Sequence, residues 1–251
     1  MDDKLPNNLA GEPGEMRVWM QRGIIGIVGV LVIMVYGYAA YSGPLESANL
    51  SAGDSYYNSL VDGFRAGQLN LKKAVPPGFM RLADPYAPAA HQRYPLLDTS
   101  YYKGKLYLYF GITPALVLFW PVLALTGNYL LHRDAVVIFC SIGFLTILGL
   151  LSALWRRYFA TVSVGVVAAG ILAVGLATGL PLILAEADVW EVSISCGYAF
   201  VMLALVAIWM ALHHAAHRGG WLAAASLTYG LAVGARPSWL FGAAILLMPV
   251  V

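Results

Sequence analysis

The stretch Gly23–Tyr41, GIIGIVGVLVIMVYGYAAY, contains 19 residues and no charge. A helix needs ~20 apolar residues to cross the hydrocarbon core of a bilayer. A secretory signal peptide is the alternative, but its apolar core is ordinarily only about 7–15 residues long. The residues before the stretch also include the acids Glu12 and Glu15, which are atypical of a signal peptide. We therefore predict a retained transmembrane helix over 23–41.

The residues in front of this stretch indicate its orientation. Arg17 and Arg22 lie on its N-terminal side. Because basic residues concentrate on the cytoplasmic side of membrane proteins, residues 1–22 are predicted to form a cytoplasmic tail. The chain would then emerge after Tyr41 on the outer face.

The composition of the whole chain agrees with a membrane protein. Of 251 residues, 60% are hydrophobic and 11% are charged, and the mean hydropathy is +0.71. Soluble domains carry roughly a quarter charged residues, so a soluble enzyme, a nucleic-acid binder and a disordered chain are excluded. Nineteen of the 28 charges fall in residues 1–105 and nine in the remaining 146. The predicted fold class is an all-α polytopic transmembrane helix bundle with a large external first loop containing surface helices.

The external loop is expected to cover residues 42–134 and to contain helices of its own. Helical spacing of apolar residues after Asp54, with Gly67 as a stop, predicts an amphipathic helix on the outer membrane surface. Prolines at 76, 77, 85 and 88 predict an irregular segment folded over a site. The apolar residues of the predicted helix are Tyr56, Tyr57, Leu60, Val61 and Phe64.

The uncharged stretch Leu106–Leu131 has two interpretations. Its 26 residues are long enough for a second spanning helix, but Pro114 and Pro121 each remove a helical hydrogen bond. If the stretch spans, five basic residues of the N-terminal tail and the short connecting segments lie on the cytoplasmic side and three lie on the outer side. If it does not, six lie inside and two outside, in better agreement with the positive-inside rule. We therefore prefer a re-entrant or interfacial segment.

The remaining chain, residues 135–251, is predicted to form the transmembrane bundle. A last apolar run from Trp239 reaches only Val251, too short to cross alone, so the bundle is expected to be truncated and the chain to be the N-terminal part of a larger protein. The expected spans before that run are Ala135–Leu154, Val162–Ala185, Val192–Leu212 and Trp221–Ala235.

Candidate catalytic residues are carboxylates that this topology brings to the outer face. Asp54 precedes the amphipathic helix, where it would act as an N-cap, as a general base for an acceptor hydroxyl, or as both. Glu186, Asp188 and Glu191 form either a solvated loop or a second carboxylate group that orients a hydroxyl or binds a divalent cation. No nucleotide-binding or metalloprotease motif occurs, so no nucleotide cofactor is expected. The metal, if any, is not identified.

Candidate substrate-binding residues are basic. Arg236 lies between two apolar runs with no acid within forty positions, and would either snorkel to the interface beside Trp239 or bind a lipid phosphate through its guanidinium fork. The other candidates would contact a headgroup or pyrophosphate, or anchor the loop at the interface. These are Lys103, Lys105, His91 and Arg93.

The layout resembles the GT-C superfamily of membrane glycosyltransferases, which includes protein mannosyltransferases and lipid A aminoarabinose transferases. In those families a first helix leads into a large external loop with an acid near the start of a surface helix, the place that Asp54 holds in Gly53-Asp-Ser-Tyr-Tyr-Asn. Their juxtamembrane segments resemble 102–131, and a second external loop carries another acid, as at 186–191. Ser55 stands where some members have a second acid.

The resemblance implies a glycosyltransferase that moves a sugar from a polyprenyl-phosphate donor to an acceptor hydroxyl, with inversion. The expected location is the outer face of a bacterial inner membrane. The implied partners are a lipid-linked sugar donor, membrane lipid, and a lipid, glycan or protein acceptor, with no nucleic acid. Asp54 would be the base, and Arg236 with Lys103 or Lys105 would stabilise the departing phosphate. The alternatives are a lipid or solute transporter and a non-catalytic membrane subunit.

Overall fold

The protein is a bundle of long helices with a small folded loop at one end. The computed structural model describes residues 13–42, 52–82, 84, 87, 94 and 99–248. Within these residues, four helical segments are long and apolar enough to cross a membrane, which confirms an integral membrane protein of the all-α class. They are Met16–Ser42, His132–Tyr158, Val164–Glu186 and Val189–His213.

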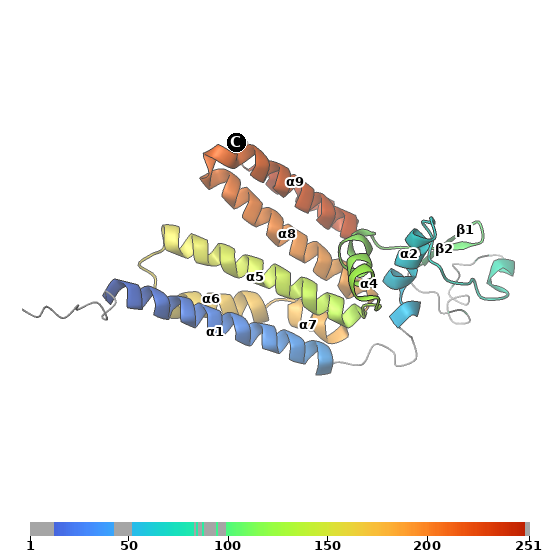
Figure 1. Cartoon of the computed structure of the whole chain (residues 1–251), viewed down its shortest axis with the longest axis horizontal. Coiled ribbons are helices and arrows are strands. Elements are labelled where there is room, and N and C mark those ends of the chain that lie inside the picture. Colours follow the sequence, from blue (N-terminus) through green and yellow to red (C-terminus); the bar gives the residue numbers. More distant parts are fainter. Residues whose placement is uncertain are drawn as a thin grey trace, which may run out of the picture.

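The bundle is arranged around α5 and α8. Helix α1 packs against α5, α6 and α7, while α8 lies between α5 and α9, and η5 returns along α9 (Figure 1). The elements of the bundle are α1 (Pro13–Ser42), α5 (His132–Tyr158), α6 (Val164–Leu176), α7 (Leu180–Glu186), α8 (Val189–His213), α9 (Arg218–Ala235) and the 3-10 helix η5 (Pro237–Leu247).

The structure adds detail to two predicted elements. Helix α1 begins at Pro13, so residues 13–22, predicted as part of a tail, are a continuous extension of the helix. The predicted span 162–185 matches the candidate span Val164–Glu186 but contains two helices. Pro181 cannot donate a hydrogen bond, and the chain restarts as α7 after a break at 177–179. The Tyr36 hydroxyl donates to the carbonyl of Gly175 at 2.9 Å just before that break.

The C-terminal apolar runs are helical, but neither belongs to the four candidate spans. Helix α9 covers the run predicted over 221–235, and η5 is a shorter apolar helix. That α9 crosses a membrane therefore stays a prediction.

The first loop contains short helices and one hairpin. The sequence did not predict the hairpin, which pairs Thr99 with Leu108 and Tyr102 with Lys105. The elements of the loop are η1 (Ala52–Asp54), α2 (Tyr56–Arg65), η2 (Phe79–Arg81), β1 (Thr99–Tyr102), β2 (Lys105–Leu108), the π-helix η3 (Ala115–Phe119) and α4 (Trp120–Thr126).

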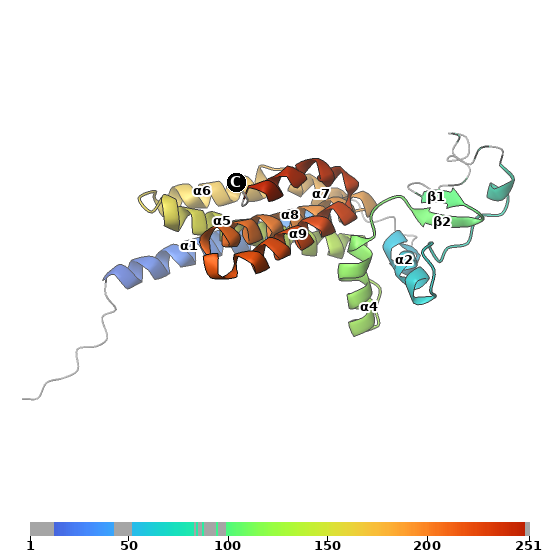
Figure 2. The ribbon, with the colours of Figure 1, turned by 90° about the horizontal axis from the view of Figure 1, so that it is seen from above.

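The stretch 106–131 does not form one helix. Its helical part is the apolar segment Ala115–Thr126, which is too short to cross a bilayer alone. Figure 2 shows α4 lying across the direction of the bundle helices rather than along them. The stretch therefore does not form one continuous spanning helix, and its re-entrant or interfacial placement stays a prediction.

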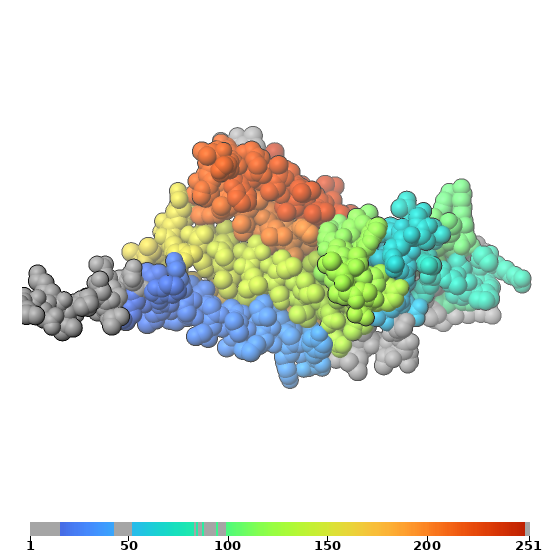
Figure 3. Space-filling model, viewed as in Figure 1, coloured from blue at the N-terminus to red at the C-terminus, as the bar shows by residue number. Residues whose placement is uncertain are grey.

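Helix α2 has the predicted amphipathic pattern, but protein covers much of its apolar face. Tyr57, Leu60 and Val61 are buried, and the Tyr57 ring stacks on Phe119 with a centroid distance of 5.2 Å. This face thus packs in part against η3, and the placement of the helix at the outer membrane surface stays a prediction. In Figure 3 the loop and α4 cap one end of the elongated molecule.

Charges separate between the two ends of the bundle because successive helices alternate in direction. One end, called here the basic end, carries Arg17 and Arg22 of α1, Arg156 and Arg157 at the end of α5, and Arg218 at the start of α9. The other end, called the acidic end, lies beside the first loop. It carries Arg133, Asp134, Glu186, Asp188, Glu191 and Arg236.

Candidate functional site

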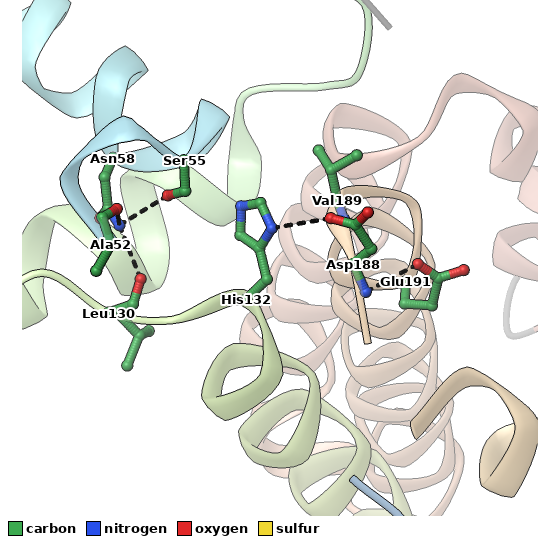
Figure 4. A network of polar contacts seen from close by, with 8 residues as sticks. All are labelled: Ala52, Ser55, Asn58, Leu130, His132, Asp188, Val189 and Glu191. Carbon is green, nitrogen blue, oxygen red and sulfur yellow. Dashed lines mark hydrogen bonds and ion pairs between the residues drawn. The ribbon is translucent and has the colours of Figure 1, made fainter. Parts of the chain in front are cut away.

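Helix α2 is tied to the bundle by Asn58. This side chain is fully buried, and its Nδ2 lies 2.7 Å from the Ala52 carbonyl, 2.9 Å from Ser55 Oγ and 2.8 Å from the Leu130 carbonyl (Figure 4). The first two acceptors hold the turn before α2, and the third holds the residues before α5. Asn58 therefore fixes the start of α2 against the acidic end.

His132 links this region to the start of α8. It is the first residue of α5, it is buried, and its Nδ1 lies 3.4 Å from Asp188 Oδ1. The Tyr57 ring meets the His132 ring edge-on at 5.9 Å. In Figure 4, α2 and Asp188 lie on opposite sides of this imidazole. Residues far apart in sequence thus meet around His132.

Asp188 and Glu191 organise the start of α8. Asp188 is the N-cap, and its Oδ1 accepts from the Val189 N–H at 2.7 Å, while the Asp188 N–H donates to Glu191 Oε2 at 3.0 Å. The Asp188 side chain also accepts from the backbone N–H of Glu191, so the two residues form a reciprocal capping box. The spacing Asp-x-x-Glu could have predicted it, and it places these two acids at the capped start of α8 rather than in a solvated loop. Glu186 is exposed at the end of α7.

The hydrogen bond with His132 holds the pKa of Asp188 below its ordinary value, assisted by the Val189 N–H and opposed by partial burial. Asp188 therefore remains a carboxylate. Its side chain is 69% exposed, so one part of it stays accessible to a ligand while the cap is intact.

Asp54 lies beside this network but is not the helix cap. It ends the 3-10 turn η1, and Ser55 occupies the N-cap position of α2. The N-cap expectation for Asp54 is thus wrong by one residue. The Asp54 side chain is exposed, and the preceding Gly53 packs close to the Tyr129 ring. Because the side chain is exposed, an acceptor can reach the carboxylate, and the role of Asp54 as a general base stays a prediction.

Arg236 reaches the same end from α9. Its Cζ lies 5.9 Å from the centroid of Trp190, the residue after Val189. Its Nη1 is buried and has no hydrogen-bond partner within the part of the chain that the structure describes. The Gly111 N–H donates to the Ala235 carbonyl at 3.2 Å, which brings the segment after β2 against the base of Arg236. The acidic end thus assembles residues from α2, α5, α8 and α9.

The predicted lysines do not join Arg236. Lys103 lies in the turn between the two strands, and its Nζ lies 5.2 Å from the Tyr102 ring centroid. Strand β2 starts at Lys105 and leads back toward Gly111, so the turn is at the distal end of a strand that extends ~13 Å. Figures 1 and 2 both show the hairpin pointing away from the bundle. His91 and Arg93 lie outside the described residues.

Sequence reasoning missed Tyr57 and His132 as parts of the site. The Tyr57 hydroxyl is buried without a hydrogen-bond partner among the described residues, and burial raises the pKa of Tyr57, so the phenol stays neutral. The helical pattern marked Tyr57 only as an apolar contact, and nothing local to His132 shows that Asp188 will meet it.

An apolar cavity of about 360 Å³ opens within the bundle. It lies between α5, the α6–α7 break and α8, and Trp239 of η5 forms part of its wall. Thr178 and Tyr198 supply the few polar groups that line it. This shape and lining suit a hydrocarbon chain.

No group of three or more His, Cys, Asp and Glu side chains in the described ranges could hold a metal ion. Comparisons of the chain with protein-family models, with curated proteins and with solved structures found no match. The site must therefore be interpreted from its own geometry.

Proposed function

We propose that the chain is a membrane glycosyltransferase that moves a sugar from a polyprenyl-phosphate donor to an acceptor hydroxyl at the acidic end. The observation that carries the proposal is Arg236, whose Nη1 is buried without an acceptor among the described residues. Buried polar atoms are nearly always paired, and a guanidinium at membrane depth is costly unless it has a function. A phosphate oxygen of a bound lipid is the missing acceptor.

The apolar cavity supports a lipid-linked donor. Trp239 lines it and follows Arg236 by three residues, so a phosphate on Arg236 would have apolar surface beside it for its isoprenoid chain. A guanidinium presents parallel N–H donors that match a phosphate group.

Asp54 is the proposed general base. Its carboxylate takes the proton of the acceptor hydroxyl while the acceptor oxygen forms a bond to the anomeric carbon. The bond from that carbon to the phosphate oxygen breaks, and its electron pair leaves with the polyprenyl phosphate, whose charge Arg236 stabilises. A single displacement of this kind inverts the anomeric centre. Asp188, held as a carboxylate, orients the acceptor from the opposite side of His132.

The distribution of arginines supports an external acidic end. Five arginines gather at the basic end, whereas the acidic end has two arginines among four acids of the bundle. By the positive-inside rule, the N-terminus is cytoplasmic and the first loop is external. We place the protein in a bacterial inner membrane on the same proposal, where a lipid-linked sugar replaces a nucleotide sugar on the outer face.

The test uses the full chain in liposomes with radiolabelled undecaprenyl-phosphate mannose, glucose or aminoarabinose and a lipid acceptor extract. Transfer is measured as release of undecaprenyl phosphate and labelled product. Asp54→Asn should abolish transfer, and Arg236→Gln should lower it strongly but leave a residual rate. Asp84→Asn, an exposed acid of the same loop, and Arg218→Gln, at the other end of α9, should retain it.

Two results would contradict the proposal. Undiminished transfer by Asp54→Asn would remove this residue as the base. Absence of transfer from every donor by a folded, inserted protein would count against the glycosyltransferase itself.

A further inference from the structure

A second cavity lies at the basic end, remote from the site described above. Its volume is about 380 Å³, and the last turns of α5 and α8 form it. Since one water takes up ~30 Å³ of liquid, there is room for a headgroup-sized molecule. The lining residues are Ala153, Arg156, Arg157, Trp209, His213 and His214.

One wall of this cavity is held in place by His213. Its Nδ1 lies 2.7 Å from the Trp209 carbonyl, and its Nε2 lies 3.0 Å from the Tyr158 hydroxyl. A carbonyl oxygen only accepts, so Nδ1 carries a proton and donates. The His213 and Trp209 rings also lie 3.8 Å apart. Both nitrogens of His213 are thus engaged, and the residue serves as a rigid part of the wall.

The other wall carries two positive charges. Arg156 and Arg157 are exposed in the last turn of α5, and neither forms an ion pair with an acid among the described residues. Of the acids of the bundle helices, Glu15 of α1 lies at this end, whereas Asp134 and those at 186–191 lie at the opposite end. The partial negative charge of a helix C-terminus offsets only part of this positive charge. The cavity therefore attracts an anion.

The chemistry of the lining selects the kind of anion. Two neighbouring guanidinium groups offer several N–H donors in fork geometry, which matches a phosphate better than a single charged atom would. Trp209 and Tyr158 are residues typical of the membrane interface, where headgroup phosphates lie.

We infer that the cavity at the basic end binds a phosphate group, carried by an anionic lipid headgroup or by a small phosphorylated molecule. This site is independent of the proposed sugar transfer at the acidic end. Arg156 and Arg157 contact the phosphate oxygens, and Trp209 with His213 forms the surface against which the rest of the ligand packs.

The experiment measures binding of dioleoylphosphatidylglycerol to the full chain in nonionic detergent by native mass spectrometry. Arg156→Gln/Arg157→Gln should raise the Kd by about tenfold or more, the loss expected when charge-assisted hydrogen bonds are removed. Arg17→Gln/Arg22→Gln is the matched control, because it removes the same charge from exposed arginines at the same end that do not line the cavity. Its Kd should change by less than about twofold.

A second double variant distinguishes loss of the phosphate contacts from misfolding. Arg156→Lys/Arg157→Lys keeps the charge but loses the fork, and should bind the lipid severalfold more weakly. Inorganic phosphate in the millimolar range is then added to the natural protein. Displacement of the lipid indicates a site for soluble phosphate compounds, and its absence indicates a site for the lipid headgroup, and either result supports the phosphate site. Equal losses in the 156/157 and 17/22 glutamine variants, or unchanged binding in the lysine variant, would overturn it.

Discussion

Replacing Gly111 with alanine tests how the first loop is held on the acidic end. A Cβ at position 111 would collide with the carbonyl oxygen of Gly234 and would lie 2.7 Å from that of Ala235. Both obstacles are backbone atoms at the end of α9, so no side chain can rotate away. The Gly111 N–H also donates to Ala235, and that bond must lengthen when the two segments move apart.

The expected cost combines two terms. Overpacking of a well-packed contact costs about 1–3 kcal/mol, and loss of a buried hydrogen bond costs about 0.5–1.5 kcal/mol net. The free energy of unfolding should therefore fall by about 2–4 kcal/mol, which corresponds to a decrease in Tm of about 4–16 °C for a chain of this size. Arg236 follows Ala235 directly, so transfer activity should fall with the contact.

Gly230→Ala is the matched control. Gly230 lies on the same helix, α9, and a Cβ there meets nothing within 4 Å. Alanine in a helix is favoured over glycine by roughly 0.5–1 kcal/mol, so this variant should unfold at the same or a higher temperature. The unfolding temperatures of both variants are measured in detergent, with size-exclusion chromatography as the readout of the folded fraction after heating. Equal unfolding temperatures for the two variants would refute the close contact of Gly111 with α9.

Two further predictions concern the network around His132. Asn58→Ala leaves buried carbonyls without their donor and should lower the free energy of unfolding by about 2–4 kcal/mol. Ser55→Ala removes only one acceptor and should lower it by less than about 1 kcal/mol. Similar losses in the two variants would argue against the hydrogen bonds from Asn58 to the backbone. Asp188→Ala should cost about 1 kcal/mol through the lost cap, while Asp188→Asn keeps the cap. Because the folded pKa of Asp188 is lowered, its carboxylate stabilises the fold above the ordinary aspartate pKa of ~3.9, and this contribution is lost as the pH falls through the folded value. The natural protein should therefore lose its advantage over Asp188→Asn below that pH in thermal unfolding curves, and a constant difference would contradict the pairing with His132.

The sequence predicts the long helices and their directions well because both depend on local patterns. The length of each apolar run marks a span. Once 106–131 is taken as non-spanning, the alternating direction of the helices predicts that the arginines at 17, 22, 156, 157 and 218 lie at the same end of the bundle. The break before Pro181 was missed, although proline gives a local reason for it. Length and composition alone do not reveal such a break, because each half is as apolar as an uninterrupted helix.

The composition of the site was harder to predict because its contacts join distant segments. Asp54, the acids at 186–191 and Arg236 were expected at one end, and the structure places them there. His132 and Asp188 are 56 positions apart, and only the packing of α5 on α8 brings them together. Lys103 was expected to act together with Arg236, whereas a hairpin directs it away.

Arg236 offsets the negative charge of the acids that lie at the same end of the bundle. Glu186, Asp188 and Glu191 give the acidic end a negative field, which repels a phosphate-bearing donor unless a cation offsets it. On the proposed function, Arg236→Gln therefore weakens donor binding in two ways, by removing the phosphate contact and by leaving this repulsion uncompensated. Only the second is reduced by salt, since exposed charges are screened over about 10 Å at 0.1 M ionic strength. The KM of Arg236→Gln for the donor should thus fall as salt rises, while kcat stays low, and the natural protein should show the opposite trend in KM. A KM that rises with salt in both proteins would mean that the acids do not act on the donor.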